Sequence, residues 1–199
     1  MTGDRYSLVL AGGQSRRLGQ DKALLPWGED TLLTHVCAIA RTVTGEVILV
    51  APHGRPYGAN GADRWLDDAW GQGPLVAIAQ GLAIVPETAW VLVLACDLPR
   101  LDATVLRGWA HHLTNLAPAV MAYLPFAQGW HPLCGWYRAA QREALQTFVE
   151  RGGRACHTWL AEMPVAIAPC PAPMLTNLNT PADWQAWRAD QSSQSQIKR

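Results

Sequence analysis

The sequence lacks an excess of charge of either sign. Its 16 lysine and arginine residues are balanced by 16 acidic residues, which gives a formal net charge of zero. A neutral chain does not have the broad positive surface that nucleic acid or an anionic membrane attracts, so neither is expected as the main partner. Any anion site in this protein must therefore be local.

Other common features are missing as well. The five cysteines, Cys37, Cys96, Cys134, Cys156 and Cys170, are widely spaced and form no CxxC pair, which argues against a zinc ribbon or a dithiol redox centre. No apolar run approaches the length of a membrane span. The odd number of cysteines and the lack of a signal peptide predict a cytoplasmic protein with unpaired thiols.

The chain is long enough to bury one sizeable core, with 199 residues of which 49% are hydrophobic. We expect a single domain over residues 1–190, followed by a polar, disordered tail over residues 191–199. Continuous apolar segments at 6–11, 47–51 and 91–95 predict strands that are buried on both faces, as in the middle of a parallel sheet.

Helical patterns alternate with these apolar segments. Asp30 or Thr31 is placed to cap one helix, Pro74 fits the first turn of a second, and Asp102 is placed to cap a third. This alternation predicts a three-layer α/β/α, Rossmann-like fold with a mainly parallel central sheet. In the rest of the chain the pattern predicts strands at 64–66, 119–123, 133–137 and 175–178, and helices at 139–151, at 154–163 and after Thr180.

A glycine-containing basic loop follows the first predicted strand. Gly12 and Gly13 end the apolar run, and Arg16, Arg17 and Lys22 come next. Because the glycines have no β-carbon, a ligand can approach the backbone, and the N–H groups and positive charges of such a turn suit phosphate oxygens. The residue order matches neither GxxxxGK[ST] nor GxGxxG. The alternative is a tight turn with a solvated basic flank.

An acidic residue at the end of another predicted strand is the natural partner of this loop. Asp97 directly follows the 91–95 segment, so it is expected at the carboxyl edge of the sheet. A carboxylate there can hold a Mg²⁺ ion that also binds phosphate oxygens and water. The alternative for Asp97 is a turn or helix-capping role before Pro99. Asp68 stays ambiguous on physical grounds, since one of two neighbouring loop acids such as Asp67 and Asp68 is often only solvated.

Polar residues in the second half of the chain are weaker candidates. Asn177 and Asn179 flank Leu178, so on a strand their side chains would point to the same side. Their alternative role is in the turn before a capped helix. His131 lies beside a proline, where a structural role is the alternative to a ligand contact.

Several motifs together resemble a known family. Residues 10–22 match the signature LAGGxSxRxGxDK at every fixed position. On this signature the chain resembles the nucleotidyltransferases of the molybdenum cofactor guanylyltransferase type and their sugar-phosphate relatives. The segments CDLP, HPL and NLNTP, and an aspartate ahead of GPL, are similar to further motifs of that family. Two positions depart from the family pattern, because Ala77 replaces a glycine of GPLAG and Ala51 stands where some members have an asparagine.

The resemblance implies a nucleotidyltransferase fold and a role for each matching residue. Catalytic roles fall to Lys22 and Asp97, and Asp97 is the implied magnesium ligand, with Mn²⁺ as the alternative metal. Arg16, at a variable position of the signature, is assigned a catalytic role with them because its charge belongs to the same basic loop. The implied contacts to the nucleotide are Leu10, Ala11, Gly12, Gly13, Lys22, Asp68 and Asp97. On the pterin side of the cleft the resemblance implies Asn177, Asn179 and His131.

The activity implied by the resemblance is the transfer of GMP from GTP to the terminal phosphate of molybdopterin, with release of pyrophosphate. The partners would be GTP, molybdopterin and the enzymes or chaperones that insert the finished cofactor into apo-molybdoenzymes. A cytidylyltransferase acting on the same pterin and a sugar-1-phosphate nucleotidyltransferase remain open alternatives. A non-catalytic carrier of the pterin is an alternative from a different class.

Overall fold

A computed structural model describes residues 4–12, 21–68 and 72–197, and for residues 191–197 it describes the backbone alone. Within these residues one sheet has seven strands in the order β5-β4-β1-β6-β8-β7-β9. The strands are β1 (Arg5–Leu10), β4 (Glu46–Ala51), β5 (Arg64–Asp67), β6 (Trp90–Ala95), β7 (Ala122–Leu124), β8 (Cys134–Arg138) and β9 (Val165–Ile167). A separate two-stranded hairpin consists of β2 (Pro26–Trp27) and β3 (Asp30–Thr31).

The four strands at one end of the sheet are parallel. Strand β1 lies between β4 and β6, so that Leu10 is paired with Val50 on one side and Ala95 on the other. Strand β5 extends the same parallel arrangement beyond β4. The carboxyl ends of all four strands therefore meet at one edge of the sheet, as the continuous apolar segments predict.

The other end of the sheet contains its antiparallel pairs. Strand β8 runs antiparallel to both β6 and β7, and β9 is parallel to β7 at the edge. The sequence pattern predicts β7 and β8 within a few residues but does not predict β9. A three-residue strand is too short for a periodic pattern to identify.

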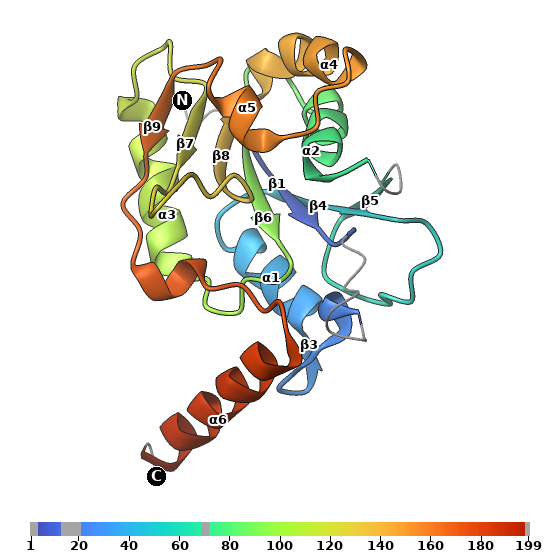
Figure 1. Ribbon diagram of the computed structural model, residues 1–199, viewed down its shortest axis with the longest axis vertical. Helices are drawn as coiled ribbons and strands as arrows, with labels where there is room; N and C mark the ends of the chain where they lie inside the picture. The colour runs from blue at the N-terminus through green and yellow to red at the C-terminus, as the bar shows by residue number, and fades with distance from the viewer. Residues whose placement is uncertain (1–3, 13–20, 69–71, 198–199) are drawn as a thin grey trace.

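Helices cover both faces of the sheet (Figure 1). On one face are α1 (Leu32–Arg41) and α3 (Ala103–His112), and on the other are α2 (Pro74–Ala83), α4 (Arg142–Glu150) and α5 (Cys156–Leu160). Alternate residues of β1 separate the two cores, because Val9 faces the first set of helices while Leu8 and Leu10 face the second. The predicted three-layer α/β/α architecture is confirmed.

Short-range signals place these helices where the sequence predicts them. The Thr31 hydroxyl accepts the N–H of Thr34 at 3.2 Å, and the Asp102 carboxylate accepts two N–H groups at the start of α3. Pro74 occupies the first turn of α2. A β-carbon added to Gly81 in the same helix would collide with the Leu8 side chain, so this glycine lets α2 pack directly on β1.

The C-terminal segment differs from its prediction in two places. Residues 175–178 form no strand; the 3-10 helix η4 (Ala172–Leu175) occupies the start of this segment. Residues 176–178 have no regular secondary structure. A four-residue segment with only two apolar residues is too short for its pattern to distinguish a strand from a loop. Helix α6 (Pro181–Ile197) opens with the predicted capping box, but its backbone stays helical beyond residue 191, where the sequence predicts disorder. Once a helix is nucleated, each added residue contributes one more hydrogen bond.

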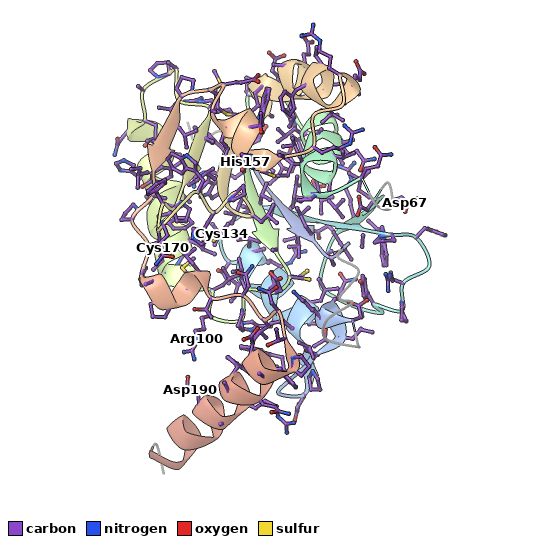
Figure 2. The ribbon with its side chains drawn as sticks, viewed as in Figure 1. Asp67, Arg100, Cys134, His157, Cys170 and Asp190 are labelled. Atoms are coloured by element: carbon purple, nitrogen blue, oxygen red, sulfur yellow. The ribbon has the colours of Figure 1, made fainter. Side chains whose placement is uncertain are left out.

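Helix α6 begins beside β3 and its far end projects from the body of the protein (Figure 1). Near its middle, Asp190 forms an ion pair with Arg100, which lies after β6 (Figure 2). The helix is thus tied to the loop that leaves the central sheet.

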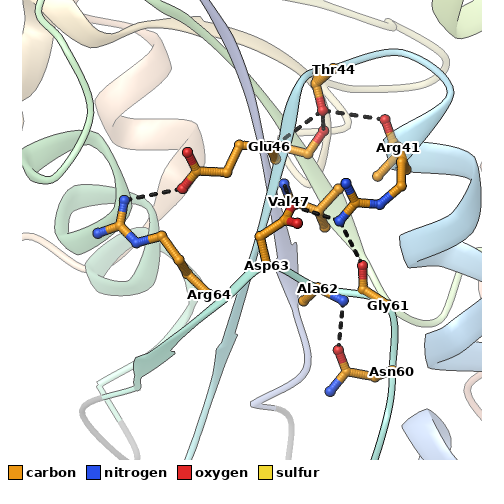
Figure 3. Close-up of polar contacts among 11 residues, drawn as sticks. Arg41, Thr44, Glu46, Val47, Asn60, Gly61, Ala62, Asp63 and Arg64 are labelled. Atoms are coloured by element: carbon orange, nitrogen blue, oxygen red, sulfur yellow. Dashed lines mark hydrogen bonds and ion pairs between the residues drawn. The ribbon is translucent and has the colours of Figure 1, made fainter.

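At the amino edge of the sheet, charged side chains form mutual contacts (Figure 3). The Asp63 carboxylate accepts the Val47 N–H at 2.8 Å and the Arg41 guanidinium at 2.6 Å. Beside it, Arg64 and Glu46 form an ion pair at 3.1 Å. The Val47 N–H and, after it, Arg41 lower the pKa of Asp63. This edge holds α1, β4 and β5 together.

Candidate active site

Three polar or glycine positions lie just beyond the carboxyl ends of the parallel strands. Hydrogen bonding continues past the strands themselves, since the Cys96 N–H donates to the Leu10 carbonyl and the Asp68 N–H donates to the Ala51 carbonyl. Gly12, Asp68 and Asp97 follow these bonded positions closely in sequence. The buried central strands therefore fix the backbone of each predicted site residue at this edge.

Lys22 lies at the centre of the polar contacts. Its Nζ atom donates to Asp97 Oδ2 at 3.0 Å and to Asn179 Oδ1 at 2.7 Å. Both charged side chains are largely shielded, with 18% of Lys22 and 17% of Asp97 exposed. The structure thus brings together three predicted site residues that are far apart in the sequence.

A network that the sequence did not reveal holds Lys22 in place. Asp21 caps the 3-10 helix η1 (Lys22–Leu24) by accepting the N–H of Ala23 at 3.1 Å. The other oxygen of Asp21 accepts the Tyr57 hydroxyl at 2.9 Å and pairs with Arg55 at 3.2 Å.

Tyr57 also hydrogen-bonds the Ala11 carbonyl at 2.9 Å. Burial and then the Asp21 carboxylate raise the pKa of Tyr57, so its hydroxyl stays a donor. A tyrosine in a glycine- and proline-rich loop was the only available signal, and no spacing rule links it to Asp21.

Asp97 has one carboxylate oxygen available to a ligand. While Oδ2 accepts from Lys22, Oδ1 is buried and has no hydrogen-bond partner among the described residues. A buried carboxylate oxygen without a partner is unfavourable and suits a hard cation. Across the described residues no three His, Cys, Asp or Glu side chains are grouped for metal binding. A cation at Asp97 would therefore take most of its ligands from phosphate and water.

Asp68 lies against the glycine that begins the basic loop. A β-carbon on Gly12 would collide with the Asp68 carboxylate, so any other residue at position 12 would displace the Asp68 side chain. Burial and, after it, the neighbouring Asp67 raise the pKa of Asp68. Asp68 Oδ1 is also buried without a hydrogen-bond partner in the described structure. Asp68 is therefore held close to the loop backbone by contacts that do not satisfy its charge.

The loop before α6 reaches this site from the opposite end of the chain. The Leu178 N–H donates to the Asp97 carbonyl at 3.0 Å, which places Asn179 beside Lys22. The Asp183 carboxylate accepts the N–H groups of Asn179 and Thr180, which fixes the start of the helix. The hydrogen bond from the Asn179 N–H and, after it, the one from the Thr180 N–H lower the pKa of the Asp183 carboxyl.

The remaining predicted residues are not brought into the Lys22 group. Asn177 is exposed, and no hydrogen bond between described residues joins it to Lys22 or Asp97. His131 is half-buried in the loop between β7 and β8, where its N–H donates to the Pro125 carbonyl and its carbonyl accepts from Cys134. Gly13, Arg16 and Arg17 lie outside the described residues.

Lys22 and Asp97 are in contact beyond the ends of the parallel strands, and Gly12 lies against Asp68 at the same edge. In an open α/β sheet this edge is where phosphate-containing ligands bind, which is the arrangement of nucleotide-binding α/β proteins. Residues 7–167 match the MobA-like NTP transferase domain, and the chain belongs to this family.

Individual proteins agree with this assignment. A Trichormus variabilis protein named as a molybdenum cofactor guanylyltransferase is 44% identical over 181 residues, covering 89% of this chain and 87% of that protein. The crystal structure of molybdopterin-guanine dinucleotide biosynthesis protein A from Archaeoglobus fulgidus has the same fold, with a TM-score of 0.78, 20% identity and coverage of 94% and 99%. A Mycobacterium tuberculosis protein solved in complex with manganese also shares the fold, with a TM-score of 0.62, 20% identity and coverage of 92% and 96%.

Two further findings concern the chain as a whole. Among its described residues, the helices are too short or too polar for any of them to cross a membrane. All five cysteines lie in the described part and are free thiols. Cys96, next to Asp97, is buried, and this burial raises the pKa of its thiol, so it stays protonated beside the site.

Proposed function

We propose that this protein transfers GMP from GTP to the terminal phosphate of molybdopterin, releasing pyrophosphate and forming the guanine dinucleotide form of the cofactor. The observation that carries the proposal is the contact of Lys22 Nζ with Asp97 Oδ2 at the carboxyl edge of the sheet. Family membership and the 44% identical relative support the choice of pterin and nucleotide.

The chemistry places few demands on acid–base groups. An oxygen of the molybdopterin phosphate attacks the α-phosphorus of GTP, the bond between that phosphorus and the β-phosphate bridge breaks, and pyrophosphate leaves with the electron pair. Because the attacking phosphate is already an anion, no general base is required. The protein must bring two anions together and stabilise charge during an in-line transfer, which is a task of positioning and electrostatics.

Lys22 has the main electrostatic role in this proposal. Its ammonium group meets the triphosphate, and Arg16 adds positive charge from the same loop. The backbone of residues 10–13 lies against the nucleotide, with Gly12 allowing the close approach. Asp68 contacts the nucleotide from the end of β5. The buried position of Lys22 strengthens its interaction with phosphate, since less water competes for the charge.

Asp97 is the proposed ligand of a divalent cation, Mg²⁺ or Mn²⁺. When bound, such a cation neutralises phosphate charge as the bond to the leaving group breaks. The unpartnered Asp97 Oδ1 supports this role. Because Lys22 already pairs with the other oxygen, the protein orients the Asp97 carboxylate before any ligand arrives.

The acceptor side of the reaction rests on fewer contacts. We place Asn177, Asn179 and His131 toward the pterin. Asn179 is the best supported of the three, because its side-chain oxygen accepts from Lys22 and it therefore lies at the junction of the two substrates. The reaction is placed in the cytoplasm, which agrees with five free thiols. The inserting enzymes or chaperones that receive the product remain a prediction.

Pyrophosphate release tests the proposal directly. The purified protein is incubated with Mg²⁺, molybdopterin and either GTP, CTP, ATP or UTP, and pyrophosphate is measured over time. Of the four nucleotides, we expect only GTP to give pyrophosphate, and only when molybdopterin is present. Release with CTP would favour the cytidylyltransferase, and release with a sugar 1-phosphate in place of molybdopterin would favour that class. No release with any combination would leave the non-catalytic carrier.

A further inference from the structure

Four aromatic rings form a continuous stack between α6, the β2–β3 hairpin and α1. The rings of Trp187 and Trp27 are stacked with centroids 4.3 Å apart, and Trp187 is stacked on Trp184 at 5.1 Å. On its other side Trp27 is stacked on His35 of α1 at 4.0 Å. Trp27 and Trp187 both pack against the core beneath α1 and α3. Such stacked aromatic pairs have a defined geometry and add to the energy of simple burial.

The stack closes a ring of contacts that includes the catalytic lysine. Trp27 lies five residues after Lys22, and Trp187 lies eight residues after Asn179. Lys22 and Asn179 are themselves joined by the 2.7 Å hydrogen bond. The two chain segments that meet at the site therefore meet a second time at the tryptophan pair.

Both connecting segments are short and internally fixed. On one side, the Leu25 N–H donates to the Lys22 carbonyl and the Leu32 N–H donates to the Leu25 carbonyl, so η1 and the hairpin are one unit. On the other side, Asp183 binds the N–H groups at the start of α6. A displacement at Trp187 is therefore passed along the helix to Asn179 with little opportunity for the chain to absorb it.

Two further contacts join α6 and the loop before it to the segment that follows β6. The Leu178 N–H bonds the Asp97 carbonyl, and Asp190 of α6 pairs with Arg100, three residues after Asp97. Figure 2 shows Arg100 on the body of the protein and Asp190 on the helix below it. The helix is thus connected to both members of the Lys22–Asp97 pair.

We propose that Trp187 is a positioning residue, which through its stack on Trp27 holds Asn179 against Lys22 and so keeps the lysine oriented beside Asp97. The part of this inference that concerns turnover rests on the proposed function. Without the stack, the start of α6 is free to move away, and Lys22 is held by fewer groups.

The chemical reactivity of Lys22 reports how firmly its contacts hold it, and the measurement needs no substrate. The sequence contains only two lysines, Lys22 and Lys198, so Lys198 serves as an internal reference. The Lys22 side chain is only 18% exposed and its Nζ atom donates to Asp97 and Asn179, so an acylating reagent reaches it only when these contacts open. Limited acetylation followed by mass spectrometry gives the ratio of modified Lys22 to modified Lys198. We expect this ratio to rise several-fold in Trp187→Ala.

Matched variants separate positioning from general damage. Trp27→Ala removes the other half of the stack and is expected to raise the ratio equally, while Trp187→Phe keeps an aromatic face and is expected to retain the wild-type ratio. Gln185→Ala changes an exposed residue of the same helix and serves as the control. If Trp187→Ala fails to fold, Trp187→Leu, which keeps apolar bulk without a ring, replaces it under the same criteria.

Turnover provides the second readout. With GTP and molybdopterin, we expect kcat of Trp187→Ala to fall about tenfold or more, because small misplacements of catalytic groups reduce rates steeply. Trp187→Phe should recover most of the loss. An unchanged acylation ratio in folded Trp187→Ala, or an equal rise in Gln185→Ala, would overturn the positioning role. A wild-type protein that releases no pyrophosphate refutes the proposed function instead, and the acylation result still decides the inference.

Discussion

Two aspartates at opposite ends of the same strand have opposite environments. Asp63 comes just before β5, at the amino edge of the sheet, and its carboxylate accepts a backbone N–H and a guanidinium that lower its pKa. Asp68 comes just after β5, at the carboxyl edge, where burial and Asp67 raise its pKa and one oxygen has no partner. The first carboxylate stabilises the fold, and the second is kept at a cost in stability.

The same contrast extends along both edges. The charged side chains of the amino edge pair with one another, as Arg64 does with Glu46. At the carboxyl edge, Asp97 keeps a buried oxygen without a partner even though it pairs with Lys22. Unsatisfied buried groups destabilise a fold unless a ligand satisfies them. The difference therefore supports the proposed binding site at the carboxyl edge, independently of any motif.

Removing the ammonium group of Lys22 at the carboxyl edge should have the largest effect on turnover. Lys22→Ala is expected to lower pyrophosphate release by about 10²–10³-fold, the loss typical for removing one group that stabilises charge in a transition state. The fold should persist, because the lysine is not part of either apolar core. Circular dichroism checks the fold, and Arg107→Ala on the exposed side of α3 is the matched loss of charge. Near-normal turnover in Lys22→Ala would contradict the assignment.

Changing Asp97 should act through the metal. Asp97→Asn removes a charged oxygen ligand, so we expect the Mg²⁺ concentration for half-maximal turnover to rise by at least about tenfold, the lower bound seen when even outer partners of a metal are lost. Titration with Mg²⁺ and with Mn²⁺ checks this. Asp102→Asn, which alters a helix cap nearby in sequence, is the control. The role fails if both variants have the wild-type metal dependence.

The third prediction concerns the unsatisfied carboxylate of Asp68. Because its pKa is raised in the folded chain, the folded state holds the proton more tightly, and stability falls as the pH rises above the ordinary aspartate pKa. Asp68→Asn removes this loss. The free energy of unfolding of the variant minus that of wild type should therefore be larger near pH ~7 than near pH ~3. Affinity for GTP should fall about tenfold, as for one lost charged hydrogen bond. Urea unfolding and GTP binding measure the two effects, and a variant that is less stable only at neutral pH would refute the first.

The smallest effect is expected at the opposite end of the strand, and it has the opposite sign. Asp63 is 39% exposed, so solvent screening limits its pair with Arg41, and Asp63→Asn should lower the free energy of unfolding by about 1 kcal/mol at neutral pH. Because the pKa of Asp63 is lowered, this contribution is present above the ordinary aspartate pKa and is lost as the pH falls through the lowered one. Urea unfolding of Asp63→Asn and wild type near pH ~7 and near pH ~3 checks this. Turnover should not change; a large loss of turnover would break the contrast between the edges.

Much of the fold could be predicted because the central strands are buried on both faces. The apolar runs that became β1, β4 and β6 are continuous, and the caps at Thr31 and Asp102 mark helix starts locally. The edge of the sheet was harder. Strand β9 is half-exposed and only three residues long, and of the predicted strand 175–178 only Leu175 is in a regular element, the 3-10 helix η4. Short elements depend on their neighbours more than on their own sequence.

The candidate site was predictable to the same degree. Gly12, Asp68 and Asp97 follow predicted strands closely and Lys22 ends the loop after the first of them, so the sheet edge at which these residues lie follows from the topology. The supporting contacts were not predictable, because Tyr57 and Asp21 meet through loops. The contact of Asn179 with Lys22 spans 157 positions along the chain, and no local pattern encodes it.

By itself the sequence determined the layered α/β fold, the edge of the sheet where the candidate site lies and the family of the protein, because buried strands and the residues that follow them form local patterns in the chain. Only the tertiary structure decided which charges are paired. It set Lys22 between Asp97 and Asn179, gave Asp63 its partners and withheld them from Asp68. Pairing depends on distances between segments remote in sequence, and those distances exist only once the sheet and α6 have packed.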